Sequence, residues 1–106
     1  MKTSEVLRRV RLHLSDGTDN PMSHRIYICY ALNYLYFHAG AIGDRDRQRV
    51  TKIIESALYP ACTLEHWLLV NHDVPLKRTK PYRKKIMTTR KAWLTHLIEH
   101  YEAKGD

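Results

Sequence analysis

The sequence predicts an all-α fold, a compact single-domain bundle of four to five helices covering residues 1–106. Three observations support this. The chain is long enough for one modest core, and 43% of its residues are hydrophobic. Glycine and proline number only four each, so they can end helices but are too few to make up long loops. Apolar residues recur at helical spacing along most of the chain, in segments that begin with good capping residues.

The first predicted helix begins at Thr3 or Ser4. Either hydroxyl can cap a helix, and Glu5 in the first turn would meet the positive end of the helix dipole. The apolar residues that follow helical spacing are Val6, Leu7, Val10 and Leu14. Residues 15–22 are dense in turn-forming residues, so we expect a loop there.

The central predicted helix spans about residues 23–39, from a Ser23 cap to a stop at Gly40. Between Ile26 and Phe37 it carries no formal charge, and nearly every angle of its helical wheel is apolar or aromatic. A helix of this kind is expected to be enclosed by protein on all sides. Its tyrosine face consists of Tyr27, Tyr30 and Tyr34. We interpret this face as core or interface, with stacking of nucleic-acid bases as the alternative.

A third helix is predicted from an Asp44 cap to about Leu58, and a short fourth helix from a Thr63 cap to about Val70. The last helix carries Trp93, Leu94, Leu97, Ile98 and Tyr101 on one face. It begins either near Thr88 or Thr89, or as early as Pro81 if carboxylate partners are found for Arg83 and Arg90. The side chains expected to pack against the central helix are Trp67, Trp93, Leu94 and Leu97.

The N-terminal residues have no apolar core of a signal peptide, and the uncharged central run is too short to cross a bilayer. We therefore expect a cytoplasmic protein without membrane contact. In a reducing compartment Cys29 and Cys62 are best interpreted as free, buried thiols.

Positive charge is concentrated near the last helix. The net charge is +7; residues 1–76 hold nine Lys and Arg against eight acids, whereas residues 77–106 hold nine against three. The predicted basic patch lies in a loop or helix start at residues 76–91 and consists of Lys77, Arg78, Lys80, Tyr82, Arg83, Lys84, Lys85, Arg90 and Lys91. Three interpretations stay open: a solvated face without specific contacts, a phosphate-binding surface, or a docking surface for an acidic protein.

The sequence His96-Leu-Ile-Glu-His100 matches the inverted zinc-protease motif. A third ligand would have to come from the six residues that follow, and Glu102 points away from the two histidines. We therefore interpret both histidines as residues on the solvent flank of an amphipathic helix. No glycine-rich phosphate loop or nucleophile motif occurs, and we expect no metal, no cofactor and no enzymatic activity.

Three stretches carry a family resemblance: Ile28-Cys-Tyr-Ala-Leu32, Thr63-Leu-Glu-His-Trp-Leu68 and Arg90-Lys-Ala-Trp-Leu-Thr-His-Leu-Ile98. Together they resemble a loose group of small helical proteins encoded by tailed bacteriophages, with the likeness covering about residues 24–101. The group has no established activity, so the resemblance implies a phage setting inside a bacterial host and no particular site residues.

Small phage proteins without enzyme motifs often occupy a surface of host machinery. The expected function is therefore a non-enzymatic interaction protein that inhibits a host defence or nucleic-acid-processing protein through the basic patch, in the manner of an anti-CRISPR protein. The alternatives are a nucleic-acid-binding module and a homo-oligomer that sequesters a cyclic nucleotide. The expected partner is thus a host bacterial protein, with nucleic acid or further copies of the chain as the other candidates.

Overall fold

The computed structural model describes residues 1–15, 21–58 and 89–106. These residues form four helices, α1 (Thr3–Leu12), α2 (Pro21–Phe37), α3 (Asp44–Leu58) and α6 (Arg90–Ala103), and no strand. The all-α fold class is therefore confirmed for the part of the chain that the structure describes. The predicted helix at residues 63–70 lies outside the described residues, as does most of the basic patch.

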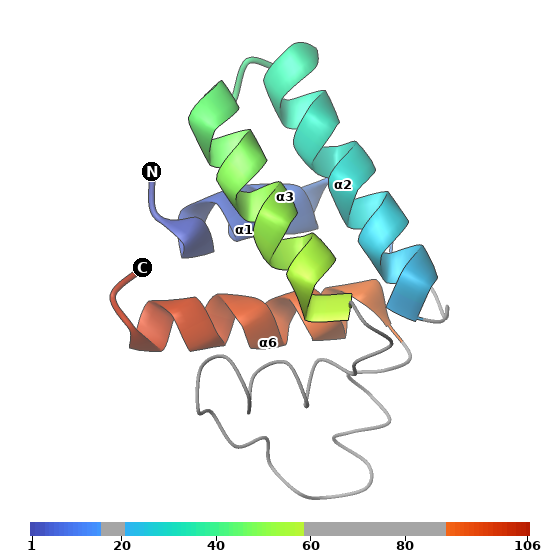
Figure 1. Ribbon diagram of the computed structural model, residues 1–106, viewed down its shortest axis with the longest axis vertical. Coiled ribbons are helices and arrows are strands. Elements are labelled where there is room, and N and C mark those ends of the chain that lie inside the picture. Colours follow the sequence, from blue (N-terminus) through green and yellow to red (C-terminus); the bar gives the residue numbers. More distant parts are fainter. Residues whose placement is uncertain (16–20, 59–88) are drawn as a thin grey trace, which may run out of the picture.

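The helices form two antiparallel pairs that cross each other (Figure 1). One pair is α1 with α6, and the other is α2 with α3; α1 also touches both members of the second pair. Trp93, Leu94 and Leu97 were expected to pack against the central helix. They lie in the common core, but the main packing partner of their helix is α1 rather than α2.

All four helices contribute to one hydrophobic core. Its largest fully buried apolar side chains are Trp93, Leu7, Ile28, Leu32, Leu35, Ile54, Leu94, Leu97 and Val6. Together with Val10, Val50, Ile98 and Tyr101, which are also buried, they fall on one side of each helix, so each helix buries one stripe. The core face predicted for the last helix is confirmed, because all five of its residues are buried.

Helix α2 is not enclosed on all sides among the described residues. Ile28, Leu32 and Leu35 are buried, but the opposite side carries large side chains that are 46–67% exposed. These are Ile26, Tyr27, Tyr30, Tyr34 and Phe37. The sequence of α2 is apolar around its whole circumference, but the helix is therefore not buried around its whole circumference. Three of the five exposed residues are tyrosines, whose hydroxyl groups remain hydrated while the rings present apolar surface.

The C-terminal end of α2 and the bounds of α3 follow the sequence signals. The predicted start of α2 is wrong, because the helix begins at Pro21, within the predicted loop and before the predicted Ser23 cap, and it ends at Phe37 instead of about residue 39. Gly40, just past α2, has a φ of 61°, the left-handed conformation that glycine adopts without a steric penalty. Asp44 opens α3, and its carboxylate accepts hydrogen bonds from the side chains of Arg47 and Gln48 at 2.6 Å and 2.7 Å. The predicted bounds of the third helix are confirmed.

The N-terminus of α1 is held by a residue far away in sequence. The Thr3 backbone N–H and hydroxyl donate to the Asp106 carboxylate at 3.1 Å and 2.8 Å, and the Ser4 hydroxyl donates to the Asp106 carbonyl at 2.7 Å. Thr3 and Ser4 were expected to act as N-caps themselves, but the N-cap residue is Lys2, which makes no side-chain cap bond. Asp106 satisfies the free backbone donors instead and ties α1 to α6.

Replacing Asp106 with alanine is expected to lower the free energy of unfolding by about 1 kcal/mol at neutral pH, as the loss of a helix cap does. Hydrogen bonding from the Thr3 backbone N–H lowers the pKa of the Asp106 carboxyl. A carboxyl group with a lowered pKa stabilises the fold above its unfolded-state pKa, and this stabilisation is lost as the pH falls through the folded-state pKa. The free energies of unfolding of wild type and Asp106→Asn, measured by urea titration, should therefore differ at pH 7. This difference should shrink as the pH falls below about 4. A constant difference across this range would contradict the assignment.

Candidate functional site

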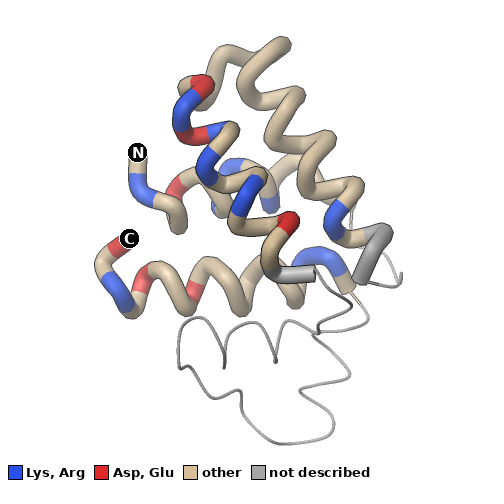
Figure 2. Tube along the Cα trace, viewed as in Figure 1, with Lys and Arg blue, Asp and Glu red and all other residues tan. Residues whose placement is uncertain are grey.

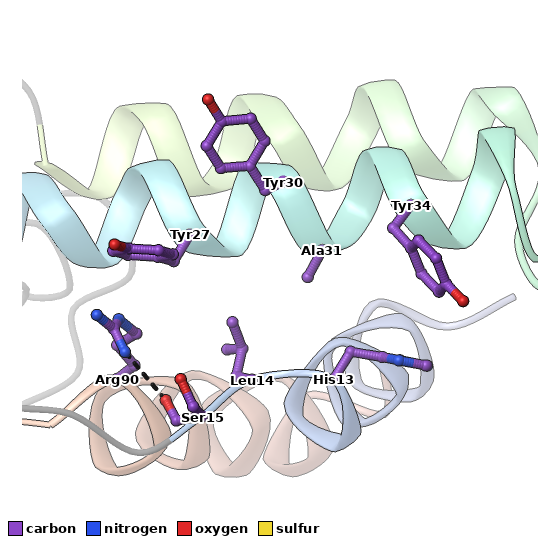
Figure 3. A pocket seen from close by; sticks show the side chains of 8 residues that line it. All are labelled: His13, Leu14, Ser15, Tyr27, Tyr30, Ala31, Tyr34 and Arg90. Carbon is purple, nitrogen blue, oxygen red and sulfur yellow. Dashed lines mark hydrogen bonds between the residues drawn. The ribbon is translucent and has the colours of Figure 1, made fainter.

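The exposed side of α2 divides into two rows. Successive residues of a helix are about 100° apart, so Ile26, Tyr30 and Phe37 share one line along α2. We call these three the outer row. Tyr27 and Tyr34 lie closer to α1, and we call them the inner row (Figure 3).

Both rings of the inner row pack against other planar side chains. The guanidinium carbon of Arg90 lies 3.9 Å from the centre of the Tyr27 ring, and Arg90 Nη1 donates to the Ser15 carbonyl at 3.1 Å. The Tyr34 ring centre lies 5.3 Å from that of His13 and 5.7 Å from that of His38. Residues from α1, α2 and α6 thus hold the two tyrosines in place.

A cleft of about 340 Å³ lies between the inner row and the end of α1. Figure 3 shows Ala31 on α2 between the two tyrosines, with Leu14 facing it from the other side of the cleft. The lining also includes Arg90 and His13, and it contains no acidic side chain among the described residues. The volume falls within the range of small-molecule sites.

Only two residues of the predicted basic patch lie in the described part of the chain. Lys91 is exposed, whereas Arg90 is 7% exposed and packs on Tyr27. Arg90 therefore belongs to the wall of the cleft and not to an open cationic surface. The seven other members, Lys77, Arg78, Lys80, Tyr82, Arg83, Lys84 and Lys85, lie outside the described residues.

The start of α6 explains why Arg90 is buried. Thr89 is the N-cap, and its hydroxyl accepts a hydrogen bond from the Ala92 backbone N–H at 3.2 Å. This confirms the later of the two predicted starts. The Tyr27 ring and the Ser15 carbonyl compensate part of the cost of burying the guanidinium.

The other arginines of the described residues mainly join helices or stabilise their ends. Arg8 forms an ion pair with Glu102 across α1 and α6. Arg47 and Arg49 pair with the acidic residues of the first turn of α3, and these contacts lower the pKa values of Asp44 and Asp46. Figure 2 shows acidic positions in the first turn of α3 and one more near its other end, with basic positions between them. The aromatic side of α2 is therefore a more distinctive surface than any cationic region of the described chain.

The histidines of the H-x-x-E-H sequence do not lie on the solvent flank of their helix. His100 is 6% exposed and His96 is half-buried, and burial lowers the pKa of His96. The expectation of two solvated histidines is therefore wrong. Across residues 1–15, 21–58 and 89–106, no group of three or more His, Cys, Asp or Glu side chains is placed to hold a metal ion.

Cys29 is a free, half-buried thiol. Burial, together with the charge of Glu55, raises its pKa, which reduces the fraction of reactive thiolate. This agrees with its interpretation as an inert residue. Cys62 lies outside the described residues.

The chain matches no protein-family model, no curated protein and no solved structure. None of the described helices is long and apolar enough to cross a membrane. The functional interpretation therefore depends on the surface of α2 and on the cleft beside it.

Sequence reasoning identified the tyrosine face of α2 but did not identify the cleft. The spacing of Tyr27, Ala31 and Tyr34 was visible in the sequence, with one small residue between two aromatic ones. The contributions of Leu14 and Arg90 depend on how α1 and α6 pack, which helical periodicity does not specify.

Proposed function

We propose that this protein is a non-enzymatic interaction protein of phage type, which binds and blocks a bacterial host protein acting in defence or nucleic-acid processing. The observation that supports this proposal is the outer row, in which Ile26, Tyr30 and Phe37 are 46%, 67% and 63% exposed. The contact surface is thus proposed to be the aromatic side of α2, with positive charge in a supporting role.

The composition of this surface suits a protein partner. The fully buried centres of protein interfaces are enriched in aromatic residues and depleted in charged ones, and aromatic residues supply many of the strongest contacts. The outer row has no formal charge and stands on a helix whose other side is anchored in the core. A rigid helix loses little conformational entropy on binding.

The net charge of +7 indicates the character of the partner surface. A cationic protein associates fastest with an acidic surface, and the attraction decreases as salt screens it. Host proteins that handle nucleic acid carry cationic binding sites of their own. We therefore propose that contact is made beside such a site, on an acidic region, and that it obstructs access sterically.

The test is capture from a nuclease-treated bacterial lysate with wild type and two variants. Ile26→Ser combined with Phe37→Ser removes apolar area from the outer row, and Leu12→Ser is the matched control. Leu12 is also an exposed apolar residue, at 83%, but it lies on α1. We expect a discrete partner with wild type and the control, and at least a tenfold reduction with the double variant, which corresponds to about 1.4 kcal/mol.

Circular dichroism should show that all three proteins are folded. Equal capture by the double variant and wild type would contradict the proposed contact surface. The same capture is repeated from a lysate without nuclease. A protein captured only from the untreated lysate would indicate that nucleic acid bridges the two, which would favour a nucleic-acid-binding module instead.

A further inference from the structure

We propose that the cleft between Tyr27 and Tyr34 binds a nucleoside phosphate, with the base inserted between the two tyrosines above Ala31. This site lies beside the protein contact proposed for the outer row, and Tyr30 borders both. It assigns a ligand class to the inner row, which the outer row does not include.

The inner row and Ala31 together create a gap. Tyr27 and Tyr34 are two helical turns apart, about 10 Å along the axis of α2. The residue on the intervening turn is Ala31, whose methyl group leaves the space between the rings unfilled. Leu14, in the segment that follows α1, faces this gap, so a flat ring placed there meets apolar groups above and below and aromatic groups at both ends.

The walls of the gap are already in place without a ligand. Arg90 fixes Tyr27 from one side, and the rings of His13 and His38 pack against Tyr34. Because these contacts restrict the side chains beforehand, a flat ring that lies between the two tyrosines loses little of its binding energy to ordering the site. Contacts with aromatic side chains are a sequence-tolerant way in which proteins hold nucleobases.

The charge of the lining favours an anionic ligand. Arg90 and His13 contribute a guanidinium and an imidazole, and no carboxylate lines the cleft among the described residues. The hydroxyl groups of Tyr27 and Tyr34 add hydrogen-bonding capacity for a sugar or phosphate. The combination of aromatic walls and the Arg90 guanidinium matches a base with an attached phosphate better than it matches a purely apolar ligand.

The same chemistry could come from a free nucleotide or from one nucleotide of a single strand. The purified chain should be titrated with adenosine monophosphate, a short oligodeoxyadenylate and ribose phosphate, by calorimetry and by the NMR shift of the Ala31 methyl group. We expect adenosine monophosphate to bind with a dissociation constant on the order of 10–100 µM. Ribose phosphate, which lacks the base, should bind at least about tenfold more weakly. An oligonucleotide that binds more tightly than the mononucleotide would identify a strand as the source, and the reverse order would identify the free nucleotide.

The variants test whether the ring of Tyr34 forms a wall. Tyr34→Ala should weaken binding about tenfold or more. Tyr34→Phe keeps the ring and loses only the hydroxyl, so it should weaken binding much less than Tyr34→Ala, and the outer-row control Phe37→Ala should bind like wild type. The proposal is overturned if neither nucleotide probe binds at millimolar concentrations. It is also overturned if ribose phosphate binds as well as adenosine monophosphate, or if Tyr34→Ala leaves the affinity unchanged. Since these titrations involve no host protein, their failure would leave the capture experiment unaffected.

Discussion

Replacing Trp93 with alanine is expected to lower the free energy of unfolding by about 3–5 kcal/mol. Trp93 is 0% exposed and is the largest fully buried side chain of the described residues. It lies in α6, the helix that packs most closely on α1, so its removal leaves a cavity in the core that joins the two helix pairs. Urea denaturation followed by circular dichroism measures the loss.

Trp93→Phe is the matched control. The Trp93 Nε1 atom has no hydrogen-bond partner among the described residues, so phenylalanine removes volume but breaks no such bond within this part of the chain. We expect it to lose less than half as much stability as the alanine variant. An alanine variant that unfolds at the same urea concentration as wild type would contradict the packing of α6 described above.

The helices that carry strong local signals were predictable. Asp44 and the apolar stripe behind it indicated the bounds of α3, and Gly40 indicated the end of α2 to within about one turn. Thr89 supplied the cap expected for the last helix. These features depend on interactions within one or two helical turns, so the sequence contains all the information they need.

The pairing of the helices was not predictable in the same way. The sequence showed that α2 is apolar on every side, but not which sides the other helices would cover. Asp106 caps α1 from the opposite end of the chain, and Arg90 packs on the Tyr27 ring and donates to the Ser15 carbonyl. Each of these contacts joins residues far apart in sequence, and periodicity within a single helix cannot reveal them.

The candidate site was predicted only in part. The tyrosine face was recognised as core or interface; its three rings are 48–67% exposed, so the core interpretation is wrong, and the interface and base-stacking interpretations stay predictions. The basic patch has two members in the described residues, and the buried one, Arg90, forms a wall of the cleft. The main feature of the candidate site among the described residues is therefore the aromatic side of α2 and not a cationic surface.

The most direct test of the account compares the two sides of α2 in the isolated chain. Leu35 is 1% exposed and Tyr30 is 67% exposed on the same helix. Leu35→Ala should lower the free energy of unfolding by about 2–5 kcal/mol, because it leaves a cavity in the core. Tyr30→Ala should change it by no more than about 0.5 kcal/mol, as expected for a surface substitution. A Tyr30→Ala variant that loses as much stability as Leu35→Ala would show that the aromatic side is part of the core and is not free to bind a partner.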